Sequence, residues 1–123
     1  MRVEHGDITT ALRPDDAGRM TFEDQWRNCQ GSTVSGLIVG PLGVHRMVGS
    51  ADGFAITHRR TGLAVALSLP TERTAIGLAV ELVLLFGYDR WDFDDPTGPG
   101  SVRTWPVAER RRLREMVGGS VRP

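Results

Sequence analysis

The stretch that most constrains this fold is residues 54–86, where a β-hairpin pattern leads directly into a strongly apolar helix. Apolar and small side chains alternate on both sides of the loop 59–62 (RRTG), as strands with one buried face require. If His58 faces Leu63, Gly62 is the last loop residue, where four-residue loops often need a positive φ angle. The sequence therefore predicts a hairpin that closes between His58 and Leu63.

The same pattern predicts the register of the hairpin. With that closure, Ile56 lies opposite Val65. Phe54 then lies opposite Leu67, which gives the hairpin one apolar face. The other face is made almost entirely of small residues: Ala55, Thr57, Ala64, Ala66 and Ser68. We expect a terminal helix to cover this small-residue face; left open, it would be a flat surface suited to a partner.

A helix follows the hairpin. Pro70 stops the strand, Thr71 is a good N-cap, and Glu72 places a negative charge in the first turn, where it suits the helix dipole. Gly87 is a plausible C-cap. Two apolar stripes run along the helix: Ile76, Ala79, Val80, Val83 and Phe86 form one, and Ala75, Leu78, Leu82 and Leu85 form the other. Because a one-faced helix needs fewer apolar positions, either the fold covers it on two sides or one stripe meets another chain, for example in a homodimer.

The rest of the chain supplies further elements. Two apolar segments, 34–39 and 44–48, predict strands on either side of a Gly/Pro turn. With the hairpin they give an α+β fold, in which a three- to four-stranded antiparallel meander carries the helix 71–86 across one face. A short helix is predicted over 22–29. A basic helix is predicted over 106–117, followed by Gly118 and Gly119.

The chain length predicts a single domain. Residues 1–20 are polar and broken by Gly and Pro, so we expect loop or partial disorder there and one α+β domain over 21–123. The single Cys29 excludes an internal disulfide and suits a reducing compartment. The N-terminus lacks the apolar region of a signal peptide, and the apolar run of the helix is too short for a membrane span. We therefore expect a cytoplasmic protein with no membrane partner.

An acidic segment rich in aromatic residues follows the helix, and it is the first candidate site. It contains four aspartates, Asp89, Asp92, Asp94 and Asp95, interleaved with Trp91 and Phe93. The spacing does not match a calcium loop, so we expect no metal. Two interpretations stay open. The segment is a solvated turn with its aromatic rings against the helix, or Trp91, Asp92, Asp94 and Asp95 bind a basic protein partner.

Arginine-rich segments give a competing, nucleic-acid-binding interpretation. Arg59 and Arg60 lie at the hairpin tip, and Arg110, Arg111 and Arg114 lie on the last helix. A two-stranded ribbon can enter a major groove and a basic helix can hold phosphates. The formal net charge of zero argues against this class, because DNA-binding domains are usually strongly basic. The simplest use of an acidic segment next to a basic one is mutual neutralisation.

Enzymatic chemistry has little support in the sequence. His45 and His58 lie on neighbouring predicted strands, and no carboxylate, Cys or Ser accompanies them at a recognisable spacing. There is no dinucleotide fingerprint, phosphate loop or paired-cysteine zinc pattern. We expect neither a catalytic site nor a cofactor.

Four segments follow one another in order: GVHR (43–46), GFAITHRRTGLAVA (53–66), PTERTA (70–75) and RWDFDDP (90–96). In this order the chain resembles small uncharacterised accessory proteins of bacteriophages and mobile elements in high-GC bacteria, although Arg90 stands where those proteins have Asp. The resemblance implies an accessory product that binds a host protein and modifies or inhibits it, as anti-defence proteins do. It implies no catalytic residue. Our leading interpretation is therefore a non-enzymatic protein-binding factor, with nucleic-acid association as the alternative.

Overall fold

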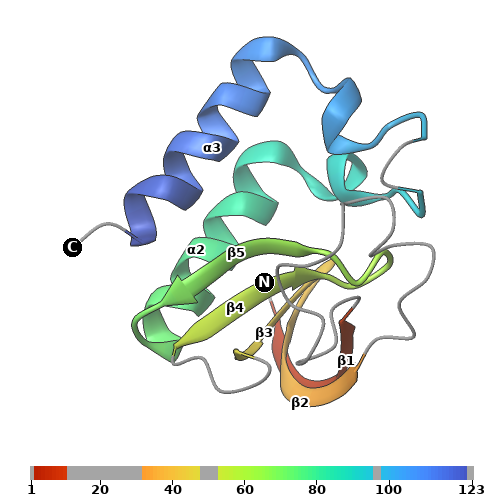
Figure 1. Cartoon of the computed structure of the whole chain (residues 1–123). Coiled ribbons are helices and arrows are strands. Elements are labelled where there is room, and N and C mark those ends of the chain that lie inside the picture. Colours follow the sequence, from red (N-terminus) through yellow and green to blue (C-terminus); the bar gives the residue numbers. More distant parts are fainter. Residues whose placement is uncertain (1, 11–31, 48–52, 96–97, 122–123) are drawn as a thin grey trace.

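The computed structural model describes residues 2–10, 32–47, 53–95 and 98–121. The strands are β1 (Val3–Thr10), β2 (Ser32–Val39), β3 (Leu42–Arg46), β4 (Phe54–His58) and β5 (Ala64–Leu69). The helices are α2 (Glu72–Phe86) and α3 (Val107–Val121), with two 3-10 helices, η1 (Tyr88–Trp91) and η2 (Val102–Thr104). The α+β class and the antiparallel meander are confirmed, but the sheet has five strands in the order β1-β2-β3-β4-β5 (Figure 1). The helix predicted over 22–29 lies outside the described residues.

The additional strand comes from the polar N-terminus. β1 pairs with β2 along its whole length, from Val3 opposite Val39 to Thr10 opposite Ser32. The expectation of a loop is therefore wrong for residues 3–10. The sequence pattern fails here because β1 is an edge strand, most of its side chains are exposed, and only Ile8 among its apolar residues is buried.

The Ile8 side chain packs closely over two glycines of the neighbouring strands, Gly36 and Gly43. A Cβ atom on Gly36 would lie 2.7 Å from the Ile8 Cδ1 atom, and one on Gly43 would lie 2.6 Å from it. The Ile8 side chain therefore reaches across β2 to β3 through space that two missing side chains leave open. β1 and β2 curve away from the hairpin side of the sheet, which suits this close approach (Figure 1).

The hairpin closes as predicted. The backbone N–H of His58 donates to Leu63, that of Gly62 donates to His58, and Gly62 has a φ angle of 77°. Beyond the loop the predicted register is wrong, because two bulges shift the pairing so that Ile56 lies opposite Ala66. Phe54 then lies opposite Leu69.

The bulges decide which β5 side chains enter the core. Ala66 and Leu69 are buried, whereas Leu67 is 41% exposed, contrary to the predicted apolar face. Ser68 has a φ angle of 58°, the one positive φ outside glycine among the described residues, and it lies directly before Leu69. The backbone turn at Ser68 is therefore part of how Leu69 reaches the core.

Helix α2 forms where the sequence predicts it. The Thr71 side chain accepts a hydrogen bond from the Thr74 N–H, and Gly87 caps the other end. α2 packs against the sheet, and α3 lies against both α2 and β5 (Figure 1). The buried side chains come from both predicted stripes: Ala75, Leu78, Ala79, Leu82 and Val83. The fold itself therefore covers this helix on two sides, which removes most of the second stripe from any contact with another chain.

Helix α3 is longer than predicted. It continues to Val121, through the two glycines that were expected to follow its end. Glycine is a poor helix former but breaks no hydrogen bond, so it weakens a helix without ending it. At the other end of α3, Trp105 packs edge-on against Trp91, with ring centroids 5.1 Å apart. Trp105 also lies 5.1 Å from the Phe86 ring, which completes an aromatic cluster at the end of α2.

Candidate functional site

The hairpin tip is held against the turn between β2 and β3. The backbone N–H of Arg59 donates to the Pro41 oxygen at 3.0 Å. Its guanidinium Nη1 donates to the Gly40 oxygen at 3.0 Å. The Tyr88 ring covers the same turn from the other side, since a Cβ atom on Gly40 would lie 2.9 Å from its Cε1 atom. Arg59 is thus hydrogen-bonded to two backbone carbonyl groups, although its side chain is exposed.

The two candidate sites from the sequence meet at this tip. Arg60 forms ion pairs with both Asp92 and Asp94, which follow η1. The basic hairpin tip and the acidic segment, more than 30 residues apart in the chain, therefore neutralise each other. All three side chains are well exposed, so the pairs orient the segment more than they stabilise it.

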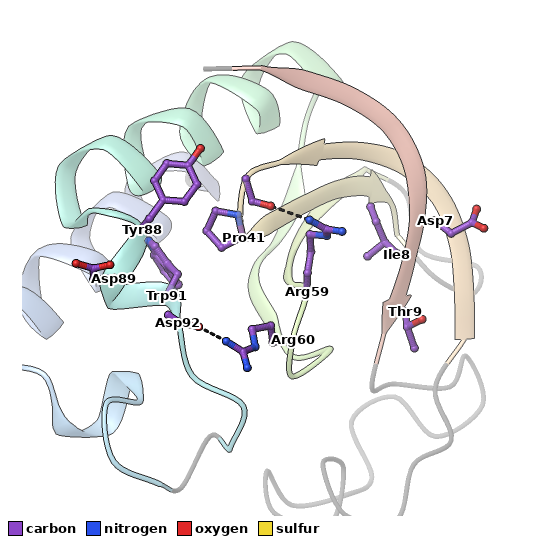
Figure 2. A pocket seen from close by; sticks show the side chains of 11 residues that line it. Asp7, Ile8, Thr9, Pro41, Arg59, Arg60, Tyr88, Asp89, Trp91 and Asp92 are labelled. Carbon is purple, nitrogen blue, oxygen red and sulfur yellow. Dashed lines mark hydrogen bonds and ion pairs between the residues drawn. The ribbon is translucent and has the colours of Figure 1, made fainter.

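An open hollow of about 650 Å³ lies between the hairpin tip, η1, the β2–β3 turn and β1 (Figure 2). Its charged lining residues are Asp7, Asp89, Asp92, Arg59 and Arg60. Three carboxylates against two guanidinium groups give this hollow, called the tip hollow below, a formal charge of −1. Such a surface offers no net attraction to a phosphate backbone.

Trp91 does not lie where a partner could touch it. Its side chain is 1% exposed, and its Nε1–H donates to the Leu82 oxygen at 3.2 Å. Phe93 is also buried. The turn interpretation of the acidic segment, with its aromatic rings against the core, fits this geometry. Asp92 and Asp94 are exposed, while Asp95 is half-buried and has an interaction of its own.

His58 links the hairpin to η1. Its Nε2 atom lies 2.6 Å from the Trp91 carbonyl oxygen, and its Nδ1 atom lies 2.9 Å from the Thr61 hydroxyl oxygen. Because a carbonyl only accepts, Nε2 carries the proton and Nδ1 accepts from Thr61. Burial lowers the pKa of His58, with Arg60 acting in the same direction, against opposing effects of the Trp91 carbonyl and Asp94. The ring is therefore a neutral, fully bonded structural group.

His45 has the same character on the opposite face of the sheet. Its Nδ1–H donates to the Arg46 oxygen at 2.6 Å, and its Nε2 accepts from the Thr57 hydroxyl at 2.7 Å. Burial lowers the pKa of His45, partly offset by the Arg46 carbonyl. Since the two imidazoles lie on different faces and each has both nitrogens bonded, they do not form a catalytic pair.

The arginines of α3 lie on two sides of the helix. Arg110 and Arg114 line a hollow against β5, and Arg111 lines another with Arg112 on a different side. The Nε–H of Arg110 donates to the Trp105 oxygen at 3.1 Å. Among the described residues, no hollow is lined both by Arg59 or Arg60 of the hairpin tip and by an arginine of α3. The combined nucleic-acid surface expected from the sequence is therefore not brought into one hollow.

The structure adds an exposed apolar surface that the sequence analysis did not single out. Leu84 is 66% exposed, Leu85 43% and Tyr88 55%. These three residues, called the α2-end surface below, lie on the last turn of α2 and at the start of η1, and Tyr88 also lines the tip hollow (Figure 2). Leu84 belongs to neither predicted apolar stripe of the helix. An apolar residue outside both stripes is expected to be exposed, and this was the signal in the sequence for the α2-end surface.

The described residues contain no group of three or more His, Cys, Asp or Glu side chains placed to hold a metal ion. No helix in the described part of the chain is long and apolar enough to cross a membrane. No protein-family model matches the chain, and comparisons with curated proteins and with solved structures give no match either.

Proposed function

We propose that this protein is a non-enzymatic binding factor that contacts another protein through the α2-end surface. The observation that carries the proposal is the exposure of Leu84, Leu85 and Tyr88, three large apolar side chains close together in the chain. Soluble proteins expose single apolar side chains routinely, but a group of them rimmed by polar residues is typical of interaction sites.

The surroundings of the α2-end surface suit a protein partner. The tip hollow next to Tyr88 supplies charges of both signs, from Asp89 and from the Arg60 pairs with Asp92 and Asp94. An apolar centre with a mixed polar rim is the usual anatomy of a specific protein–protein interface. In this proposal Asp92 and Asp94 orient the partner at the rim, and the buried Trp91 lines the tip hollow together with Tyr88.

The resemblance to accessory proteins of phages and mobile elements supplies the biological setting. We propose a host protein as the partner, with inhibition of that protein, such as a defence factor, as the outcome. The fully bonded imidazoles of His45 and His58 support a binding rather than a catalytic role. No cofactor is part of the proposal.

Affinity capture from a high-GC bacterial lysate tests the proposal. Wild-type protein should retain a host protein that Leu84→Arg does not retain. Val107→Arg is the matched control, because Val107 is 61% exposed on a different helix and the substitution introduces the same charge. If both variants captured the host protein equally well, the α2-end surface would not be the binding surface. A monomeric wild-type protein that captures nothing would overturn the binding function itself.

Self-association through the same surface is the homodimer form of the proposal. Light scattering measures it directly, and Leu84→Arg should then convert a dimer to a monomer. A dimer that persists in Leu84→Arg would place the contact elsewhere.

Nucleic-acid association is the second candidate, and the arginines of α3 favour it. Arg111 and Arg114 are exposed and lie outside the neutralised hairpin tip. A salt-dependent gel shift that Arg111→Ala plus Arg114→Ala weakens would support this function. Loss of the shift in Arg59→Ala plus Arg60→Ala would show that the hairpin tip contributes to nucleic-acid binding. The absence of any shift at low salt would exclude nucleic-acid binding.

A further inference from the structure

A second groove lies on the other side of the hairpin, between β5 and α3. It consists of two hollows of about 230 Å³ and 450 Å³. The two hollows share four lining residues, Val65, Val102, Arg103 and Leu113, so they form one continuous depression. This basic groove is separate from the α2-end surface, and none of its lining residues lines the tip hollow except Trp91.

The floor of the basic groove is apolar, and the polar side chains deeper in it are hydrogen-bonded. Val65, Val102 and Leu113 are half-buried aliphatic side chains on three different elements. Deeper in the groove, the polar atoms of His58 and Thr61 are bonded to each other and to backbone groups. The Trp91 Nε1–H is also bonded. A hydrocarbon chain on this floor would therefore gain apolar contact without breaking a hydrogen bond.

The rim of the groove carries one sign of charge. Among the described residues, the charged lining residues are Arg103, Arg110 and Arg114, and none is a carboxylate. Arg103 already has an interaction of its own, so the anion is assigned to Arg110 and Arg114. The acidic residues of α3 lie elsewhere: Glu109 pairs with Arg90, and Glu115 lines the hollow on the other side of the helix. The Nε–H bond to Trp105 holds the Arg110 guanidinium at the groove. The groove is thus complementary to an anion attached to an apolar body.

We propose that the basic groove binds a free single-chain carboxylate amphiphile, of the fatty-acid class, with its chain on the Val65–Leu113 floor and its carboxylate at Arg110 and Arg114. The hollow of about 230 Å³ lies below the usual range for ligand pockets and that of about 450 Å³ lies at its lower end, which suits a single chain rather than a larger ligand. The groove shares no lining residue with the α2-end surface, so this binding is independent of the proposed protein contact.

Calorimetry with sodium dodecanoate, well below its micelle concentration, tests the proposal. We expect one dodecanoate per chain, and binding at least about tenfold weaker for dodecyltrimethylammonium, which has the same chain and the opposite charge. Each methylene removed, from dodecanoate to decanoate to octanoate, should weaken binding by up to about fourfold. Amide NMR shifts should change on β5 and α3 and not at the α2-end surface.

Two α3 variants separate groove binding from general attraction to a basic helix. Arg114→Gln should weaken dodecanoate binding by about three- to tenfold. Arg112→Gln removes the same charge from the other side of the same helix and should leave the affinity unchanged. Val65→Glu places a carboxylate on the groove floor and should abolish binding while circular dichroism confirms the fold.

Several results would overturn the proposal. One is the absence of heat and of NMR shifts with dodecanoate. Equal binding of the cationic amphiphile, or equal effects of Arg112→Gln and Arg114→Gln, would also contradict it. If a synthetic acidic Leu/Glu amphipathic peptide shifted the β5 and α3 amides while dodecanoate did not, the groove would belong to a protein partner instead.

Discussion

The Nε2 atom of His58 lies 2.6 Å from the backbone oxygen of Trp91 and joins the hairpin to η1 across 33 residues of chain. This hydrogen bond fixes the start of the acidic segment directly beside the hairpin tip. Asp92 and Asp94 therefore lie within reach of Arg60, and Phe93 stacks on the His58 ring with centroids 4.2 Å apart. A single buried imidazole thus organises the surface that the sequence suggested as two separate sites.

The burial of two histidines predicts a loss of stability in mild acid. In the unfolded chain both titrate at their ordinary pKa of 6.5, whereas burial lowers the pKa of His45 and His58 in the fold. Below 6.5 the unfolded state binds more protons, so the free energy of unfolding falls as the pH decreases toward the lowered values and is fully present above 6.5. Each histidine contributes a slope of at most about 1.4 kcal/mol per pH unit.

Urea unfolding between pH 8 and pH 5.5 measures this slope. His58→Gln should be less stable than the wild type at pH 8. Its stability should also depend less steeply on pH below 6.5, because the variant lacks the imidazole that takes up a proton on unfolding. An unchanged slope in His58→Gln would show that His58 does not contribute to the pH dependence.

Thr61 provides the hydrogen bond to the Nδ1 atom of His58. The Thr61 hydroxyl donates to Nδ1 of His58 and accepts from the Leu63 N–H at 3.3 Å. Thr61→Val preserves the shape but leaves a buried nitrogen and an amide without partners, so we expect a loss of about 1–3 kcal/mol in unfolding free energy. Thr9→Val, on exposed β1, is the control and should change stability by less than about 0.5 kcal/mol. Chemical denaturation of both variants makes the comparison, and equal stabilities would contradict the assigned hydrogen bonds.

The local elements could be predicted because their signals lie close together in the sequence. Gly62 marks the end of the hairpin loop, and Thr71 and Gly87 mark the ends of α2. β1 could not be predicted in the same way, because an edge strand that buries little beyond Ile8 has no apolar alternation to read. The contacts of Arg60 with Asp92 and Asp94 depend on tertiary structure, so both sides of the site could be predicted from local patterns but their meeting could not.

The space around two glycines predicts opposite effects of replacing them with alanine. A Cβ atom on Gly36 would lie 2.3 Å from the Val44 backbone oxygen, and a backbone atom cannot move aside. Gly36→Ala should therefore cost about 1–3 kcal/mol or prevent folding. Gly77, on the exposed side of α2, has no atom within 4 Å of an added Cβ. Gly77→Ala should stabilise the protein by about 0.5–1 kcal/mol through helix propensity. Thermal unfolding compares the two, and a tolerated Gly36→Ala would contradict the close approach of β2 and β3.

The bulges in the hairpin place Leu67 and Leu69 in different environments, whereas an unbroken strand would place both side chains on the same face. Leu69 is 0% exposed in the core, whereas Leu67 is 41% exposed. Leu69→Ala should therefore cost about 2–5 kcal/mol, and Leu67→Ala less than about 1 kcal/mol. Without the bulges both leucines would face the core, and the two substitutions would have similar costs. Urea unfolding of the pair decides between the registers, since a large cost for Leu67→Ala is compatible only with the unbroken pairing.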